Sequence, residues 1–508
     1  MLRSCVTKSQ RRGLATVAAG GAAAQRSSKK EGDISDAFVS LSGVKRDPLP
    51  DRFRQLKCDL VRGREKQITE SWNRLLRDLK RENETIAEKG SDVVPQIEFA
   101  KLESGVRGLE DEIKKRGVVV VRGVVPEAEA RAYKEEVEEY VKKNPWTRAF
   151  PADNPQVYEL YWSAPQLKAR AHPNFMRVQQ HLMSGLWRAS DPASPISVAS
   201  PLSYADRLRI RQPGDATFAL GPHIDGGSVE RWEPEGYGRG GGVYDAVFAG
   251  AWERYDPWDA SGRVGAVSNL YDGLGACSMF RMWQGWLSMS RTRPAEGTLL
   301  VNPLMHRATA YVLLRPFFEA VDEGARGEVY LDERNWRMVG EKGMTSELQG
   351  ASPGHGQELT DALHPHLELD RTMVHVPEIK PGDFVAWHCD TNKMPPPLTP
   401  SAIHAVDKLH QGTSDSSVLY IPICPVTALN AQYVARQLEA WRRGTPGPDF
   451  PGGEGEARHS GRPTEEMLQQ WAGIEALRSM GLEKLVPASD ATAGQREAVD
   501  QANDILGF

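Results

Sequence analysis

The sequence predicts an α+β protein in which an antiparallel β-sandwich or barrel lies between two helical regions. Apolar residues recur at helical spacing in residues 51–115, and helical patterns return after Pro425. Between them, residues 207–425 contain short β-like segments separated by Gly, Pro and Asp. The chain has 508 residues, of which 40% are hydrophobic, so it can bury a full core without disulfides or a structural metal.

The first thirty residues have the composition of a mitochondrial presequence. They contain many Lys, Arg, Ser, Ala and Thr residues but no Asp or Glu. We therefore expect residues 1–30 to direct the protein to the mitochondrial matrix. The alternative is a disordered tail on a cytosolic protein, because termini rich in Ala, Gly and Ser are common.

Residues 31–115 form the predicted helical N-terminal region, in which Ile68, Trp72 and Leu75 are among the apolar residues at helical spacing. The segment 117–125 is short and β-branched, which predicts a strand. A helix is then expected from Pro126, because proline fits the first turn and the acids after it lie beside the positive end of the helix dipole.

The main predicted domain spans residues 116–430, and a helical C-terminal region spans residues 431–508. A glycine-rich stretch at residues 233–275 predicts a long loop that could close over a ligand. Helices are expected at residues 431–443 and 464–480. The strands expected in the main domain are 207–211, 280–289, 298–301, 310–314, 373–376, 383–387 and 418–421.

Composition argues against several classes of partner. The formal net charge is −5, and no run of Lys and Arg interleaved with aromatics occurs along the folded part, so we expect no nucleic-acid partner. No apolar run approaches the roughly 20 residues that cross a bilayer, so we expect no membrane span. The five cysteines lack any CxxC spacing, which argues against a disulfide framework and a thiolate zinc site.

The first candidate metal ligands are His223 and Asp225, in the sequence LGPHIDGGS. Side chains two residues apart on a strand point to the same face, so an imidazole nitrogen and a carboxylate oxygen can reach one cation. The glycines that follow leave open space beside this pair. A lone His and Asp in a turn more often hydrogen-bond to each other, so the pair indicates a metal site only if a third ligand is present.

A second candidate segment reads IKPGDFVAWHCD and is followed, after a proline-rich stretch, by IHAVDKLH. A Pro-Gly-Asp turn feeding a strand that ends in histidine could supply the third ligand. Two histidines and one carboxylate form the facial triad of non-haem Fe(II) oxygenases, which leaves metal positions open for a cosubstrate and O₂.

These motifs resemble a known family. The strand GVVVVRGVVPE, the His-x-Asp pair and the later Gly-Asp…His stretch are similar to the phytanoyl-CoA-dioxygenase-like clan of 2-oxoglutarate/Fe(II) oxygenases. The longer motifs resemble the DUF1479 family over roughly residues 51–461, and they read RIRQPGDATFALGPHIDGGSVERW, FRMWQGWL and DFVAWHCD. The resemblance implies a double-stranded β-helix core, of jelly-roll or cupin-like form, flanked by helices. It also implies Fe(II) as cofactor and 2-oxoglutarate as cosubstrate.

By position, the resemblance implies that His223, Asp225 and His404 bind the iron and form the catalytic centre. In the family pattern the second histidine follows the first by five residues, and here residues 392–402 interrupt that spacing. Removing this stretch, which is either a real loop or a retained intron, brings His404 into place. His388 remains the alternative third ligand.

The resemblance leaves the cosubstrate anchor open. Many relatives hold the distal carboxylate of 2-oxoglutarate with an arginine about ten residues after the distal histidine, but residues 413–418 contain none. Arg209 and Arg281 are the candidate cofactor-binding residues, and Lys408 is a further one. For each arginine, an ion pair or a solvent-facing charge is the alternative.

We therefore expect an Fe(II)/2-oxoglutarate-dependent oxygenase that uses O₂ to hydroxylate a small-molecule substrate. One alternative is a metal-dependent isomerase or lyase on a cupin-like barrel, which the missing arginine favours. The other is a non-catalytic protein that binds a small molecule, because a fold does not determine a function.

Overall fold

The computed structural model describes residues 48–216, 221–224, 227–240, 242–271, 273, 278–388, 404–450 and 452–508. The expected presequence, Asp225 and the interrupting stretch 392–402 lie outside these residues, as does the side chain of His404. The predicted α+β class is confirmed, because helices surround one large mixed sheet and a smaller one.

Two sheets build the centre of the molecule. In the larger sheet β1 and β2 are parallel and the other neighbouring strands are antiparallel. Its order is β1 (Gln96–Glu98), β2 (Val118–Arg122), β14 (Phe384–His388), β8 (Trp283–Ser288), β16 (Ser416–Tyr420), β6 (Leu208–Arg211), β4 (Val157–Tyr158) and β3 (Ala149–Phe150). The smaller sheet has the order β12 (Gln357–Glu358), β7 (His223–Ile224), β15 (His404–Val406), β9 (Leu299–Val301) and β13 (Val374–His375).

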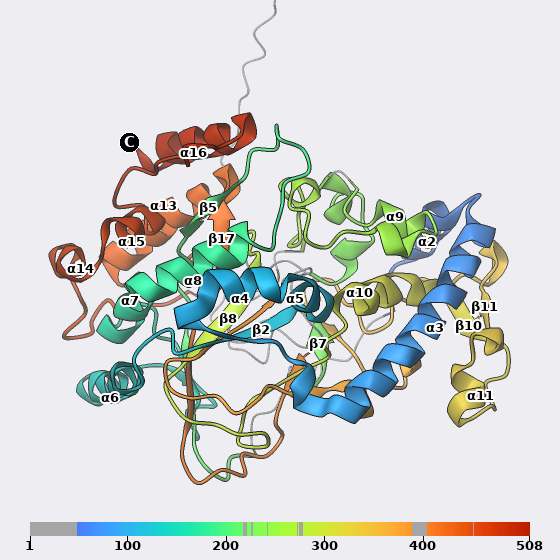
Figure 1. Cartoon of the computed structure of the whole chain (residues 1–508), viewed down its shortest axis with the longest axis horizontal. Helices are drawn as coiled ribbons and strands as arrows, with labels where there is room; N and C mark the ends of the chain where they lie inside the picture. Colours follow the sequence, from blue (N-terminus) through green and yellow to red (C-terminus); the bar gives the residue numbers. More distant parts are fainter. Residues whose placement is uncertain are drawn as a thin grey trace, which may run out of the picture.

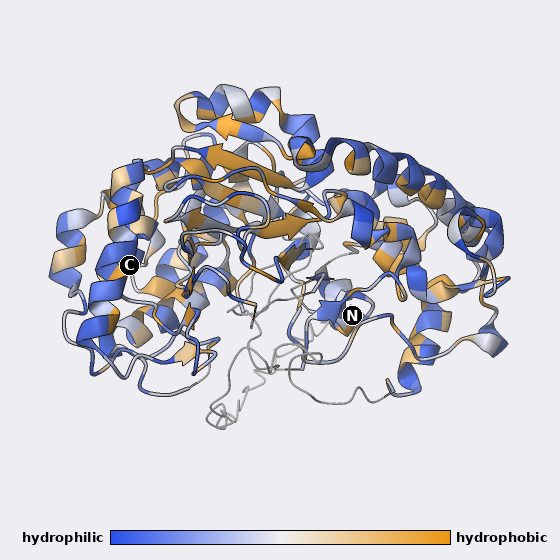
Figure 2. Cartoon of the chain, turned by 90° about the horizontal axis from the view of Figure 1, so that it is seen from below, coloured by the Kyte–Doolittle hydropathy of each residue, from blue (hydrophilic) through white to orange (hydrophobic). Residues whose placement is uncertain are grey.

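Alternation along the strands determines which face of the larger sheet meets the smaller one. On β2, Val118 and Val120 join the core that includes Leu299 and Val301 of β9. Val119 and Val121 join a second core, beneath helices α6 (Glu127–Lys143) and α8 (Pro173–Ser184). This strand is therefore buried on both faces, as its unbroken run of valines predicts. The apolar strands lie inside a mostly hydrophilic layer of helices (Figure 2).

Helices gather at two ends of the sheets (Figure 1). The long helix α3 (Glu65–Lys89) lies at one end with α2 (Arg52–Val61), α10 (Met305–Leu314) and the hairpin of β10 (Phe318–Ala320) and β11 (Trp336–Met338). At the opposite end, α7 (Ala164–Ala171) and the C-terminal helices cover the pair β5 (Ser197–Leu202) and β17 (Cys424–Val426). The C-terminal helices are α13 (Ala428–Arg443), α14 (Glu465–Trp471), α15 (Ile474–Ser479) and α16 (Ala493–Leu506).

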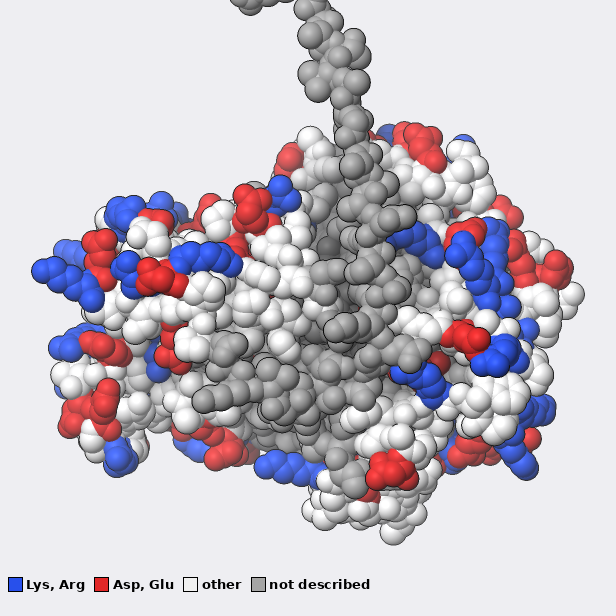
Figure 3. Space-filling model, turned by 180° about the vertical axis from the view of Figure 1, so that it is seen from behind, with Lys and Arg blue, Asp and Glu red and all other residues white. Residues whose placement is uncertain are grey.

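Short helices complete the structure. They are α4 (Leu102–Gly108), α5 (Glu110–Arg116), α9 (Asp245–Phe248), α11 (Gly327–Leu331) and α12 (Leu369–Thr372). On the face seen in Figure 3, Lys and Arg are interspersed with Asp and Glu on the coloured surface. In the part of the chain that the structure describes, every helix is too short or too polar to cross a membrane.

Two element predictions are wrong. The strand expected at residues 310–314 is the second half of helix α10. This half of α10 is buried on all sides, and a short, continuous apolar run does not distinguish a buried strand from a buried helix. The single helix expected at residues 464–480 is two helices, α14 and α15, with Ala472 and Gly473 between them in extended conformations.

The Pro-Gly-Asp turn before β14 depends on Gly382. This residue has φ +87°, and a Cβ built on it would lie 1.9 Å from the carbonyl oxygen of Val125. We expect Gly382→Ala to lower the free energy of unfolding by about 2–4 kcal/mol, because it combines a left-handed backbone with a clash. Gly123→Ala is the control: φ is +65° there but its Cβ would meet nothing within 4 Å, so about 1–2 kcal/mol is expected. Equal losses of stability in urea denaturation would contradict the role of the clash.

Candidate active site

His223 lies on β7, and only 1% of its surface is exposed. Its Nδ1 atom is 2.7 Å from the carbonyl oxygen of Gly221, so the proton of the neutral ring belongs on Nδ1. Burial lowers the pKa of His223 to about 4. The ring is therefore neutral at physiological pH, which is the form in which histidine binds metals.

The strand register brings His404 beside His223. In the antiparallel pairing of β15 with β7, these two residues are directly opposite each other. On its other side, His404 is opposite Val301 of β9, so it occupies the central strand of the smaller sheet. Asp225 follows the last residue of β7 by one position in the sequence. Two of the three predicted iron ligands are thus neighbours in the sheet, although they are 181 positions apart in the chain.

His388 has different surroundings. It ends β14 in the larger sheet, where its ring stacks on Trp187 with centroids 4.5 Å apart and meets Trp258 edge-on at 4.3 Å. Its Nε2 atom is 3.0 Å from the carbonyl oxygen of Pro257. Burial, and secondly the nearby Arg263 guanidinium, lower the pKa of His388 well below its ordinary value. These contacts give His388 a packing role. Within the described residues, no three His, Cys, Asp or Glu side chains cluster in a way that could hold a metal ion.

Three arginines alternate along β6 or directly precede it, and all are buried. Arg211 forms an ion pair with Asp215 at 2.6 Å and also donates to the carbonyl oxygens of Asp407 and Lys408. Arg209, which is 6% exposed, donates from Nη2 to the carbonyl oxygen of Gly297 at 3.1 Å. Among the described residues, Arg209 has no carboxylate partner, so its positive charge is available to an anionic ligand.

Arg281, the other predicted cosubstrate anchor, is fully buried against protein groups. When the side-chain amide of Gln284 is oriented with its oxygen toward Arg281, that oxygen accepts hydrogen bonds from Arg281 Nε and Nη2 at 2.7 Å. Burial raises the pKa of the Asp206 carboxyl to about 7, and the positive charges of Arg207 and, more weakly, Arg281 oppose that rise. Lys408 is exposed. Of the three predicted cations, Arg209 is therefore the one that combines burial with an unneutralised charge.

Sequence reasoning missed Arg207, the first arginine of the row. It is 2% exposed and lies on the same side of the β6 segment as Arg209, because alternate residues of a strand share a face. The signal was present in the spacing Arg-x-Arg-x-Arg of residues 207–211. A strand with basic residues at alternate positions in an otherwise apolar sheet predicts a buried row of cations.

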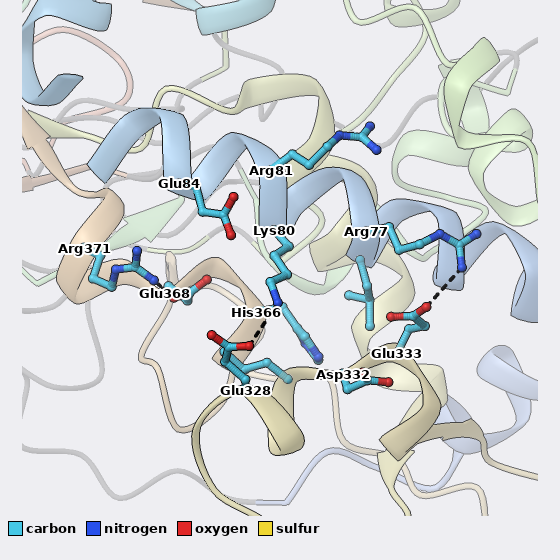
Figure 4. Close-up of a pocket in the computed structure, with 12 residues that line it drawn as sticks. Arg77, Lys80, Arg81, Glu84, Glu328, Asp332, Glu333, His366, Glu368 and Arg371 are labelled. Carbon is cyan, nitrogen blue, oxygen red and sulfur yellow. Dashed lines mark hydrogen bonds and ion pairs between the residues drawn. The ribbon is translucent and has the colours of Figure 1, made fainter. Parts of the chain in front are cut away.

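A separate cavity of about 430 Å³ lies between α3 and the segment around α11, and its lining includes His366 (Figure 4). Its charged side chains are largely paired with one another, with Arg77 and Glu333 at 3.1 Å and Lys80 and Glu328 at 3.4 Å. None of the residues predicted for the iron site lines it. We regard this cavity as a surface groove between helices and not as the predicted site.

Comparison with known proteins adds the family. A model of the Gig2-like family matches residues 47–482. The crystal structure of GlcNAc Inducible Gene 2 (DUF1479) from Candida albicans is 30% identical, with a TM-score of 0.78, and the match covers 92% of this chain and 97% of that chain. A Salmonella typhimurium LT2 structure named "Putative Oxidoreductase" is 27% identical, with a TM-score of 0.70, over 86% of this chain and 99% of that chain. The Escherichia coli K12 protein YbiU is 30% identical over 409 residues, which are 78% of this chain and 87% of YbiU.

Proposed function

The chain belongs to the Gig2-like family, and from its own candidate site we propose that it is a non-haem Fe(II)/2-oxoglutarate-dependent oxygenase that hydroxylates a small molecule. The observation that carries the proposal is the pairing of His404 directly opposite His223 on neighbouring strands. The name of the Salmonella relative, which calls it an oxidoreductase, supports the same class of activity.

We propose that the two sheets form a double-stranded β-helix around this site. Within each sheet, a strand from the last part of the domain lies between two strands from earlier parts. In the larger sheet β16 lies between β8 and β6, and in the smaller sheet β15 lies between β7 and β9. This interleaving, together with the core shared by the two facing sheets, supports a jelly-roll arrangement.

The proposed ligand set fits ferrous iron. Neutral imidazoles and a carboxylate are the donors of the facial triad, and the hydrogen bond from Nδ1 of His223 to Gly221 orients the ring so that Nε2 can bind the metal. In this proposal His223, Asp225 and His404 hold the iron, which with bound 2-oxoglutarate and O₂ supplies the oxidising chemistry. The other residues of the chain bind and orient the reactants and exclude water.

Arg209 is the proposed anchor for the distal carboxylate of 2-oxoglutarate. A guanidinium grips a carboxylate through two parallel hydrogen bonds, and burial strengthens that interaction. Arg209 projects from β6, whose neighbour β16 carries Ser416, and the Ser416 hydroxyl donates to the same Gly297 carbonyl oxygen as Arg209. The arginine thus takes over, from an adjacent strand, the role that relatives of the clan give to a residue after the distal histidine.

The test of the proposed function is anaerobic addition of Fe(II) and 2-oxoglutarate to the purified protein. We expect the weak visible charge-transfer band that such iron chelates give. Tight iron binding without the band would contradict the 2-oxoglutarate assignment and favour the metal-dependent isomerase or lyase. Absence of iron binding would favour a protein that only binds a small molecule.

We expect Arg209→Gln to weaken 2-oxoglutarate binding by about 10- to 100-fold, because a charge-assisted hydrogen-bond pair is lost. The measurement is a titration of the visible band with 2-oxoglutarate. Arg131→Gln is the control, because Arg131 is ion-paired to Asp415 at 2.8 Å. An unchanged affinity in Arg209→Gln would exclude Arg209 as the anchor.

A further inference from the structure

Arg207 has the features of an anion-binding residue. Its Nε and Nη2 atoms are buried and have no hydrogen-bond partner among the described residues. These two nitrogens form one edge of the guanidinium, and that edge matches the two oxygens of a carboxylate in a bidentate pair. Leaving both buried donors without an acceptor is costly, so a ligand that supplies two acceptors would be stabilised there.

The acidic neighbour of Arg207 is Asp206, whose buried carboxyl interacts electrostatically with Arg207 more strongly than with Arg281. In the described part of the chain, Asp206 forms no ion pair with this guanidinium, and its Oδ1 atom instead accepts the backbone N–H of Arg207 at 2.5 Å. The aromatic ring of Phe450 covers one face of the guanidinium, with its centroid 4.9 Å from the guanidinium carbon. Aromatic contact on the face leaves the edge of the guanidinium for hydrogen bonding.

Tyr420 connects Arg207 with Arg209. It follows Val418, the β16 residue paired with Arg209, by two positions, and its backbone N–H donates to the carbonyl oxygen of Arg207. Both guanidiniums lower the pKa of the Tyr420 hydroxyl, while burial, the largest effect, raises it above the ordinary value. Both positive charges therefore act on the same buried hydroxyl.

The row of arginines contacts the segment that directly follows β15, the strand of His404. Beyond the end of β6, the backbone carbonyl oxygen of Asp215 accepts the N–H of His410, and Arg211 donates to the carbonyl oxygens of Asp407 and Lys408. Arg209 donates to the carbonyl oxygen of Gly297, the residue before Thr298, whose carbonyl oxygen accepts the backbone N–H of Asp407. Along the strand, Arg209 lies about 7 Å from Arg211, and Arg207 lies about the same distance beyond Arg209.

We infer that Arg207 binds a carboxylate of the substrate, beside the cosubstrate carboxylate held by Arg209, so that the substrate is a carboxylic acid. The assignment of the two bound anions as substrate and cosubstrate rests on the proposed function. The presence of two neighbouring anion-binding arginines rests only on Arg207 and Arg209.

The test measures binding to the metal-free protein, with benzoate and acetate as probes. Benzoate suits a guanidinium that already lies against an aromatic ring, and acetate tests the carboxylate alone. Isothermal titration is carried out with and without saturating 2-oxoglutarate. The variants are Arg207→Gln, Arg207→Lys and Arg209→Gln, with Arg131→Gln as the control.

We expect the native protein to bind at least one probe in the presence of 2-oxoglutarate. Arg207→Gln should weaken that binding tenfold or more, Arg207→Lys should restore part of it, and Arg209→Gln should leave it within about threefold. In the iron-loaded protein, the 2-oxoglutarate titration should respond to Arg209→Gln and not to Arg207→Gln. The circular dichroism spectrum and melting temperature establish that each variant is folded.

Other results would overturn the inference. Displacement of the probe by 2-oxoglutarate would make Arg207 part of the cosubstrate site. Absence of binding by both probes, or equal binding by native protein and folded Arg207→Gln, would exclude a carboxylate site at this residue. If probe binding depends on Arg207 but the iron and 2-oxoglutarate band is absent, the anion site stands and the proposed oxygenase function fails.

Discussion

His404→Ala is expected to abolish the Fe(II)/2-oxoglutarate absorption band, whereas His388→Ala is expected to preserve it. Loss of a direct metal ligand should weaken iron binding by more than about 100-fold, since loss of an outer-shell partner alone weakens binding by 10- to 100-fold. His388 lies between Trp187 and Trp258 in the larger sheet, so its removal should instead leave a cavity. We expect this cavity to lower the free energy of unfolding by about 2–4 kcal/mol.

The two readouts separate the roles of the two histidines. Iron binding is measured by anaerobic titration and stability by urea denaturation of the metal-free protein. His181→Ala on α8 is the control, because the His181 ring hydrogen-bonds to the carbonyl oxygen of Arg177 in its own helix. A band that survives His404→Ala but disappears in a folded His388→Ala protein would make His388 the iron ligand. It would contradict the assignment of His404 from its pairing opposite His223.

Trp72→Ala is expected to give the largest loss of stability, about 3–5 kcal/mol. Trp72 is fully buried on α3, and its ring stacks on Phe318 at 4.3 Å and on Tyr311 at 5.3 Å. Those partners belong to β10 and α10, so one side chain joins the N-terminal helix to two later elements. Truncation removes the aromatic contacts and leaves a cavity that rigid neighbours cannot fill.

Trp146→Ala is the matched control for this prediction. Trp146 is 53% exposed, so the same change of residue should alter the free energy of unfolding by less than about 1 kcal/mol. The measurement is urea or thermal denaturation of both variants. A loss in Trp72→Ala no larger than that in Trp146→Ala would show that α3 is not coupled to the core through this ring.

Local sequence patterns predicted most of the elements. The run of valines at residues 118–121 could be recognised as a strand, because four consecutive β-branched residues suit a strand that is buried on both faces. The helical spacing around Trp72 likewise predicted the buried face of α3. The error at residues 310–314 arose where periodicity is uninformative, since every position of that half of α10 is buried.

The candidate site was harder to predict, because its parts come from distant segments. The motifs and the family resemblance gave His223 and Asp225, with His404 as the third ligand and His388 as the alternative, and they offered Arg209 and Arg281 as anchors with Lys408 behind them. Which groups a buried arginine contacts depends on segments far away in the sequence, as with Arg211, which donates to the carbonyl oxygens of Asp407 and Lys408.

The sequence by itself determined the α+β class and the buried strands, because these follow from patterns within a few neighbouring positions. Only the tertiary structure decided that His404 is opposite His223, and that His388, in the larger sheet, packs against Trp187. The physical reason is that strand register is set by pairing between segments far apart in the chain, and burial of one face selects a single register.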